Sequence, residues 1–296
     1  MSVKRKERVR TVSGNNGAAP VVAFIGTTPN IGTTSAAFAT AYRLAELGGI
    51  EVGYLCLNLK SAKLHRFLGE DEPDVTLDRL QPELRSASLT PDMLRSADCT
   101  VRGRANLHVL FGNLNREGAE FVGAEEIDHL LDVAEKTYGF VVLDVGAYWD
   151  NAATICSIRR ADSRVLVTTP ALSHFQEDGR RWVGSVSPLF QVQPNQYDCI
   201  IVHYPWRKGG YRMNDICKEL GTAPMGEFKM NDSMFASLDK GGYDEWLRED
   251  PAGRTAMRKP AARLLVRHGV QGSFSSMVRQ PWYRRLNVHR NGVGSS

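Results

Sequence analysis

Long apolar runs are missing from this sequence of 296 residues. No stretch approaches the about 18 consecutive apolar residues that a membrane-spanning helix needs, which argues against an integral membrane protein. The basic start, MSVKRKERVR, leads into no apolar segment, so the sequence does not predict a signal peptide. We therefore expect a cytoplasmic protein, peripheral at the inner membrane face if its basic ends bind anionic lipid.

Cysteine is scarce and irregularly placed. The five cysteines are odd in number and include no C-x-x-C pair, which argues against a disulfide framework and a zinc site. The sequence also has no G-x-S-x-G motif, and its seven histidines form no close metal-binding pair. These absences argue against disulfide-stabilised proteins, zinc proteins and serine hydrolases.

Acidic residues are absent from residues 252–296, which carry nine Lys/Arg. Residues 1–10 carry five Lys/Arg and one Glu, whereas residues 11–251 hold 23 Lys/Arg and 32 Asp/Glu. The formal net charge of +4 therefore combines basic ends with an acidic body. Such ends bind nucleic acid, anionic membrane or an acidic partner, or remain solvated tails. Trp282–Arg285 adds aromatic rings to arginine in the tail, which suits any of these anionic surfaces.

Apolar β-type runs alternate with helical patterns along the rest of the chain. This alternation predicts an α/β fold: a doubly wound, mostly parallel sheet with helices on both faces. The expected strands are Val21–Gly26, Glu51–Leu57, Asn106–Phe111, Phe140–Val145, Arg164–Thr168, Asp198–Val202 and Pro224–Phe228. The expected helices are Thr33–Leu47, Pro91–Ala97, Ala124–Tyr138, Asn151–Arg160, Phe175–Pro188, Met213–Leu220 and Pro260–Gly269.

Composition divides the chain into three parts. Residues 1–19 are polar and charged and predict a disordered basic lead, residues 20–269 predict one folded domain, and residues 270–296 predict a basic tail. Within the domain, Gly69–Ser88 is polar with two prolines, and we expect a surface excursion there.

The segment Val21–Phe38, VVAFIGTTPNIGTTSAAF, has the layout of a phosphate-binding loop between a strand and a helix. The usual pattern is G-x-x-x-x-G-K-[ST], in which lysine binds phosphate and Ser/Thr holds Mg²⁺. Here Thr33 takes the lysine position and Thr34 the metal-ligand position, and no lysine lies in the segment. The alternative is an ordinary strand-to-helix turn.

The order of these segments resembles the MinD/ParA family of P-loop ATPases, and within it the pilus-assembly branch called TadZ or CpaE. The family loop K-G-G-x-G-K-[ST]-T is matched by Thr28–Ser35, with threonine at Thr28 and Thr33 in place of both lysines. YGFVVLDVGAYWD is similar to the strand carrying the Walker B aspartate, which falls on Asp144.

Two further segments depart from the family at positions that carry its chemistry. Asn58 stands where the family has an aspartate after the second strand, with Lys60 close behind. His203 stands at the end of DCIIVHYP, where relatives carry a base-contacting Asn. The resemblance covers about residues 20–268.

The resemblance implies a nucleotide site for ATP and Mg²⁺, with Thr34 and Asp144 holding the metal and Asp144 as the catalytic residue of an active form. Family members dimerise face to face around nucleotide, so it also implies a homodimer. The implied nucleotide-binding residues are Thr28, Pro29, Asn30, Ile31, Gly32, Thr33, Thr34, Asn58, Lys60, Gly146 and His203.

Two lysines and one carboxylate are missing from this set, and losing one well-placed stabilising group slows such a reaction by about 10²–10³. We therefore expect a pseudo-ATPase that positions or scaffolds a pilus or secretion assembly at a membrane, through a protein partner. One alternative is a DNA-partition or conjugation factor that binds nucleic acid through its basic ends. The other is an active ATPase with a rearranged site in which Lys60 replaces the lost charge.

Overall fold

The computed structural model describes residues 18–270 except Lys208. The predicted lead, residues 1–19, and the predicted tail, residues 270–296, therefore lie almost wholly outside the described residues. No helix within residues 18–270, Lys208 aside, is long and apolar enough to cross a membrane.

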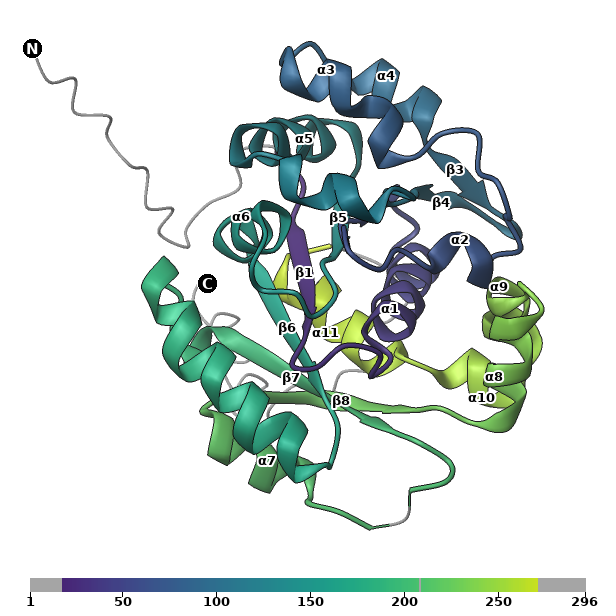
Figure 1. The fold of residues 1–296 in the computed structure, drawn as a ribbon. Coiled ribbons are helices and arrows are strands. Elements are labelled where there is room, and N and C mark those ends of the chain that lie inside the picture. The colour runs from purple at the N-terminus through teal and green to yellow at the C-terminus, as the bar shows by residue number, and fades with distance from the viewer. Residues whose placement is uncertain (1–17, 208, 271–296) are drawn as a thin grey trace, which may run out of the picture.

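Eight strands form one sheet in the order β3-β4-β2-β5-β1-β6-β7-β8 (Figure 1). All neighbouring strands run parallel except β3 and β4, which form an antiparallel edge. The prediction of a doubly wound, mostly parallel sheet is confirmed. The strands are β1 (Val21–Gly26), β2 (Val52–Cys56), β3 (Cys99–Val101), β4 (Arg104–Leu110), β5 (Phe140–Asp144), β6 (Ser163–Thr168), β7 (Tyr197–His203) and β8 (Ala223–Lys229).

Helices cover both faces, because most strands are apolar on both sides and each face needs a cover. One core cluster lies under α1 (Thr33–Gly48), α8 (Asp232–Asp239), α9 (Tyr243–Glu249) and α11 (Arg258–Arg267). The other lies under α3 (Gln81–Arg85), α4 (Pro91–Ala97), α5 (Ala124–Thr137), α6 (Ala152–Arg160), η3 (Ser173–Val186, a π-helix) and α7 (Met213–Leu220). Short helices complete the chain: α2 (Leu64–Phe67), α10 (Pro251–Thr255), η1 (Leu77–Leu80), η2 (Arg116–Phe121), η4 (Ser187–Phe190) and η5 (Pro194–Gln196).

The interpretation of Gly69–Ser88 as a polar excursion is wrong in its second half. Leu77, Leu80 and Leu84 are buried in the core cluster under α5, on the short helices η1 and α3. Their spacing of three and four residues puts them on one side of the turn, which explains the burial. Because charged residues surround these leucines, the composition of the segment is polar although one side of it is apolar.

Arg43 ties α1 to the segment that follows α8, although its side chain is only 1% exposed. Its guanidinium donates to the backbone oxygens of Leu247 and Gly253, each at 2.6 Å, and of Ala256 at 3.2 Å. A fourth hydrogen bond, of 2.8 Å, goes to the carboxylate of Glu46. Burial lowers the pKa of Arg43, with Glu46 opposing the shift. One charged side chain thus satisfies three carbonyls of α9, α10 and the turn after them.

The chain enters and leaves the domain at the amino edge of the sheet. The first described residues lead directly into β1, and the backbone N–H of Ala19 donates to the Glu135 carbonyl at 3.1 Å. At the other end His268 hydrogen-bonds Ser163, the first residue of β6, at 2.9 Å. The His268 ring also packs edge-on against Phe140, the first residue of β5.

Candidate functional site

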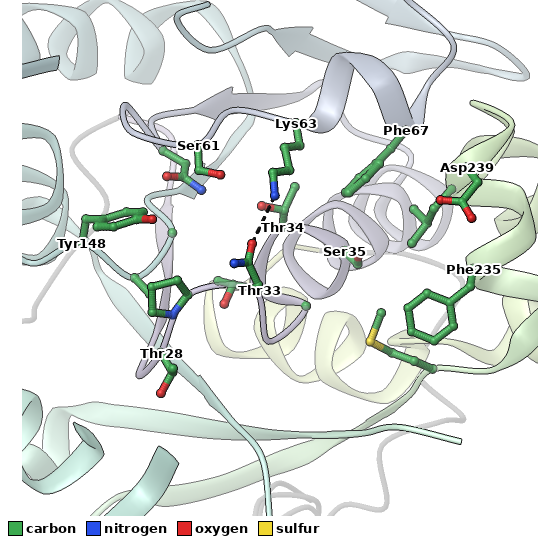
Figure 2. A pocket seen from close by; sticks show the side chains of 18 residues that line it. Thr28, Thr33, Thr34, Ser35, Ser61, Lys63, Phe67, Tyr148, Phe235 and Asp239 are labelled. Atoms are coloured by element: carbon green, nitrogen blue, oxygen red, sulfur yellow. Dashed lines mark hydrogen bonds between the residues drawn. The ribbon is translucent and has the colours of Figure 1, made fainter. Parts of the chain in front are cut away.

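The topology leaves a crevice at the carboxyl edge between β1 and β5. These two strands are neighbours, yet the helices that follow them, α1 and α6, lie in different core clusters and so cover opposite faces. Open α/β sheets bind ligands at such a reversal. A pocket of about 240 Å³ lies here, lined by residues after β1, β2, β5 and β8. Figure 2 shows these side chains surrounding the start of α1.

The backbone of the loop after β1 presents the first turn of α1 to this pocket. Gly32 takes φ +90° at the helix entry, a conformation that favours glycine. No side chain caps the helix, and its first turn holds no acidic residue. The first N–H groups and the positive end of the helix dipole are therefore available to an anion.

The two threonines at the family's lysine positions make their contacts elsewhere. The Thr28 hydroxyl donates to Asp178 of η3 at 2.7 Å, and in Figure 2 it points away from Lys63. Thr33 is buried, and its Oγ1 lies so close to Gly26 that a Cβ on that glycine would approach within 2.5 Å. Neither residue brings a positive charge to the pocket.

Asn58 supplies a buried acceptor without a partner. The residue is 8% exposed and lines the pocket, and its Oδ1 has no hydrogen-bond partner in the described part of the chain. Its amide packs on Gly146, which has φ +67° and where a Cβ would lie 2.5 Å from the Asn58 Cγ. A buried polar atom without a partner is destabilising, so a ligand, water or metal ion would satisfy it.

Asp144 ends β5 beneath the pocket with its side chain fully buried. Burial raises the pKa of Asp144, while hydrogen bonds from Thr34, Tyr54 and the Gly146 N–H oppose the rise. The Tyr54 hydroxyl donates at 2.9 Å, and burial together with Asp144 raises the pKa of Tyr54 well above its ordinary value. Thr34, Asp144 and Asn58 thus gather oxygen atoms of the kind that Mg²⁺ binds, often in combination with phosphate.

The two lysines that follow β2, Lys60 and Lys63, have different partners and line different cavities. Lys60 pairs with Asp150 at 2.8 Å, and its Nζ lies 5.7 Å from the centre of the Tyr148 ring. Lys60 lines a separate cavity rather than the pocket over α1. Lys63 lines the pocket, and its Nζ donates to Asn30 Oδ1 at 3.1 Å (dashed in Figure 2). Sequence reasoning named Lys60 and missed Lys63.

The end of the pocket away from the phosphate loop is mainly apolar. Phe67 of α2 and Phe235 and Leu238 of α8 line it, with Asp239 as the acidic residue. The Trp206 ring packs at a tilt against Phe235, with ring centres 5.2 Å apart. A pocket with an anion-binding end and an apolar aromatic end suits a nucleotide.

Most of the predicted site residues meet at this pocket. Besides Lys60, three others do not line it: Ile31 is buried in the core under α1, Asp144 lies buried beneath the pocket, and His203 lies at the end of β7 with its Nε2 3.6 Å from Glu227. Within the described residues no three His, Cys, Asp or Glu side chains cluster as a metal site of their own. The predicted site residues that line it are Thr28, Pro29, Asn30, Gly32, Thr33, Thr34, Asn58 and Gly146.

No protein-family model and no curated protein sequence matches the chain. Solved structures with the same fold do. A ParA family ATPase from Chlorobium tepidum TLS is similar at 17% identity and a TM-score of 0.71, over 83% of this chain and 99% of that one. The septum site-determining protein MinD from Pyrococcus horikoshii OT3, complexed with Mg-ADP, is similar at 16% identity and a TM-score of 0.69, over 86% and 99%. A chain of the MinC:MinD cell division protein complex of Aquifex aeolicus is similar at 16% identity and a TM-score of 0.67, over 84% and 96%.

Proposed function

We propose that this protein binds a nucleoside polyphosphate, with its phosphates at the start of α1 and its base towards the apolar end of the pocket. The observation that carries the proposal is the uncapped first turn of α1, which opens into a pocket at the reversal of the sheet. The Mg-ADP complex of a structural neighbour supports the same class of ligand.

Mg²⁺ fits the residues present. Thr34 and Asp144 would hold it with the phosphates, and Asn58 Oδ1 would accept from a water of its coordination shell, which removes an otherwise unsatisfied buried atom. When bound, the metal would neutralise phosphate charge. It would also stabilise the ionised Asp144, whose carboxylate burial disfavours.

Hydrolysis is expected to be slow or absent. The Thr28 and Thr33 side chains carry no charge and make their contacts elsewhere, and Asn58 replaces a carboxylate. Phosphoryl transfer depends on such groups to stabilise developing charge, at about 10²–10³ in rate for each. We therefore propose a nucleotide-responsive switch or pseudo-ATPase rather than an efficient enzyme.

The cellular role that we propose is that of a positioning or scaffold subunit of a membrane-associated pilus or secretion assembly. It would act as a homodimer with a protein partner. The MinC:MinD complex among the structural neighbours supports partner binding by this fold in general. Purification with crosslinked partners from the native host, with and without ATP, tests this role, and recovery of replication or partition proteins instead of envelope proteins would contradict it.

Calorimetry tests nucleotide binding directly. AMP, ADP, ATP and GTP are titrated with Mg²⁺ into the full chain, and affinity should rise with the number of phosphates. Thr34→Val should weaken the Mg²⁺-dependent part of binding. Thr40→Val is the matched control, because the Thr40 hydroxyl bonds Ala36 O within α1 at 2.8 Å. Absence of binding refutes the proposal, and turnover equal to that of an ordinary MinD/ParA ATPase refutes the pseudo-ATPase role.

A DNA-partition or conjugation role is the second candidate, favoured by the nine Lys/Arg without any acidic residue in 252–296. Binding through phosphates must weaken steeply as salt rises. Absent binding at low salt, or binding that does not change with salt, eliminates this role. The third candidate, an active ATPase that depends on Lys60, predicts that Lys60→Ala abolishes turnover, and unchanged turnover contradicts it.

A further inference from the structure

The pocket over α1 has a cation that comes from outside the phosphate loop. Of the residues that line it in the described part of the chain, Lys63 carries the positive charge and Asp239 the negative one. Lys63 directly precedes α2 and reaches across the start of α1 to the tip of the phosphate loop. Figure 2 shows the Lys63 side chain extending into the pocket, with a dashed line marking the hydrogen bond from its ammonium group to Asn30.

The present partner of Lys63 is a weak one for an ammonium ion. Asn30 Oδ1, at 3.1 Å, is a neutral amide oxygen on an exposed residue held at φ +61°. No carboxylate within the described residues pairs with Lys63, whereas Lys60 three positions earlier is paired with Asp150 at 2.8 Å. An exposed lysine keeps three donors and a flexible stem, so a phosphate nearby can recruit it at little conformational cost.

We infer that Lys63 is the phosphate-binding cation of this pocket, supplied by the β2–α2 segment in place of the lysines that the phosphate loop lacks. The inference rests on the proposed nucleotide function. Bound polyphosphate draws the Lys63 Nζ from Asn30 Oδ1 to a phosphate oxygen. The ligands of this pocket are therefore molecules with at least two linked phosphates, for which a point charge above the helix start adds to the backbone N–H groups.

Three variants of the full chain separate this role from general loss of charge. Lys63→Met removes the ammonium group, Lys63→Arg keeps the charge, and Lys60→Met removes the neighbouring lysine that lines another cavity. Calorimetry measures Mg-ATP, Mg-ADP and inorganic triphosphate binding at several salt concentrations. Circular dichroism melts of the ligand-free variants establish that all of them fold.

Lys63→Met should bind each ligand about tenfold more weakly, which is about 1.4 kcal/mol, and its affinity should depend less on salt. Lys63→Arg and Lys60→Met should bind as the unchanged chain does, within about twofold, and all melting temperatures should agree. If the unchanged chain binds none of the ligands, both the proposed nucleotide function and the inferred role of Lys63 are refuted. If it binds them but Lys63→Met binds equally well, or Lys60→Met loses as much, the role of Lys63 is refuted while the proposed function stands.

Discussion

Replacing Arg43 by methionine tests how the C-terminal helices are fastened to the domain. Methionine keeps an apolar stem of similar length but removes every donor of the guanidinium. The backbone oxygens of Leu247, Gly253 and Ala256 then lose a charged partner in a buried place. The Glu46 carboxylate keeps two charged partners in this variant, Arg258 at 2.8 Å and Arg104 at 3.4 Å.

The expected loss follows from the three carbonyls. A hydrogen bond to a charged group contributes about 1.5–3 kcal/mol, and the three are not additive because one side chain makes them all. Leaving a buried acceptor without a partner costs about 1–3 kcal/mol, so for three coupled carbonyls we adopt about 3–5 kcal/mol as the expected loss of unfolding free energy. At about 2–4 °C per kcal/mol for a domain of this size, the melting temperature should fall by roughly 6–20 °C.

Urea and thermal unfolding followed by circular dichroism measure this loss. Arg248→Met is the matched control, because Arg248 lies on α9 but is exposed and pairs with its neighbour Glu249. The control should unfold at the same midpoint as the unchanged chain. An Arg43→Met protein that unfolds at that midpoint too would refute the reasoning that these carbonyls depend on Arg43.

Three further outcomes concern the pocket. Burial raises the pKa of Asp144, so its stabilising contribution is full below the ordinary carboxyl pKa and falls as pH rises towards the folded value. Asp144→Asn should therefore melt higher than the unchanged chain, by a margin that grows as pH rises above the ordinary carboxyl pKa, and lose its response to Mg-ATP; a lower melting point contradicts this. Gly146→Ala strains φ +67° and collides with Asn58, so calorimetry should find nucleotide binding lost and urea unfolding a loss of about 1–3 kcal/mol; binding as in the unchanged chain is the contrary result. Trp149→Phe loses the 3.2 Å hydrogen bond to Gly26 O, so urea unfolding should find a loss of about 1 kcal/mol; an unchanged unfolding midpoint is the contrary result.

The sheet could be predicted because strand and helix signals alternate clearly along the chain. All seven expected strands are present, since most of them are compact apolar runs between turn residues. The missed strand, β3, has three residues and depends on the tight turn before Arg104. The helices α8, α9 and α10 were also missed, because each has at most eight residues, too few to show a clear apolar period.

Capping residues would have revealed two of those helices. Asn231 accepts from the Met234 N–H at the start of α8. Asp250 precedes α10 and accepts from the backbone N–H groups of Ala252 and Gly253 in its first turn, where Pro251 takes the first helical position. At the site, motif spacing located the loop and Asp144. It could not distinguish Lys63 from Lys60, because the path of the β2–α2 segment decides which lysine faces the pocket.

The first and last described residues both lie at the amino edge of the sheet, which gives the domain two opposite poles. The pocket opens at the carboxyl edge, roughly 20 Å away along the six residues of β1. An anchor attached beyond Val270 would therefore act on the amino edge, where His268 contacts β5 and β6, and would leave the pocket over α1 open. Such a domain can be anchored at one pole while a second body docks at the other, as a bridging adaptor requires.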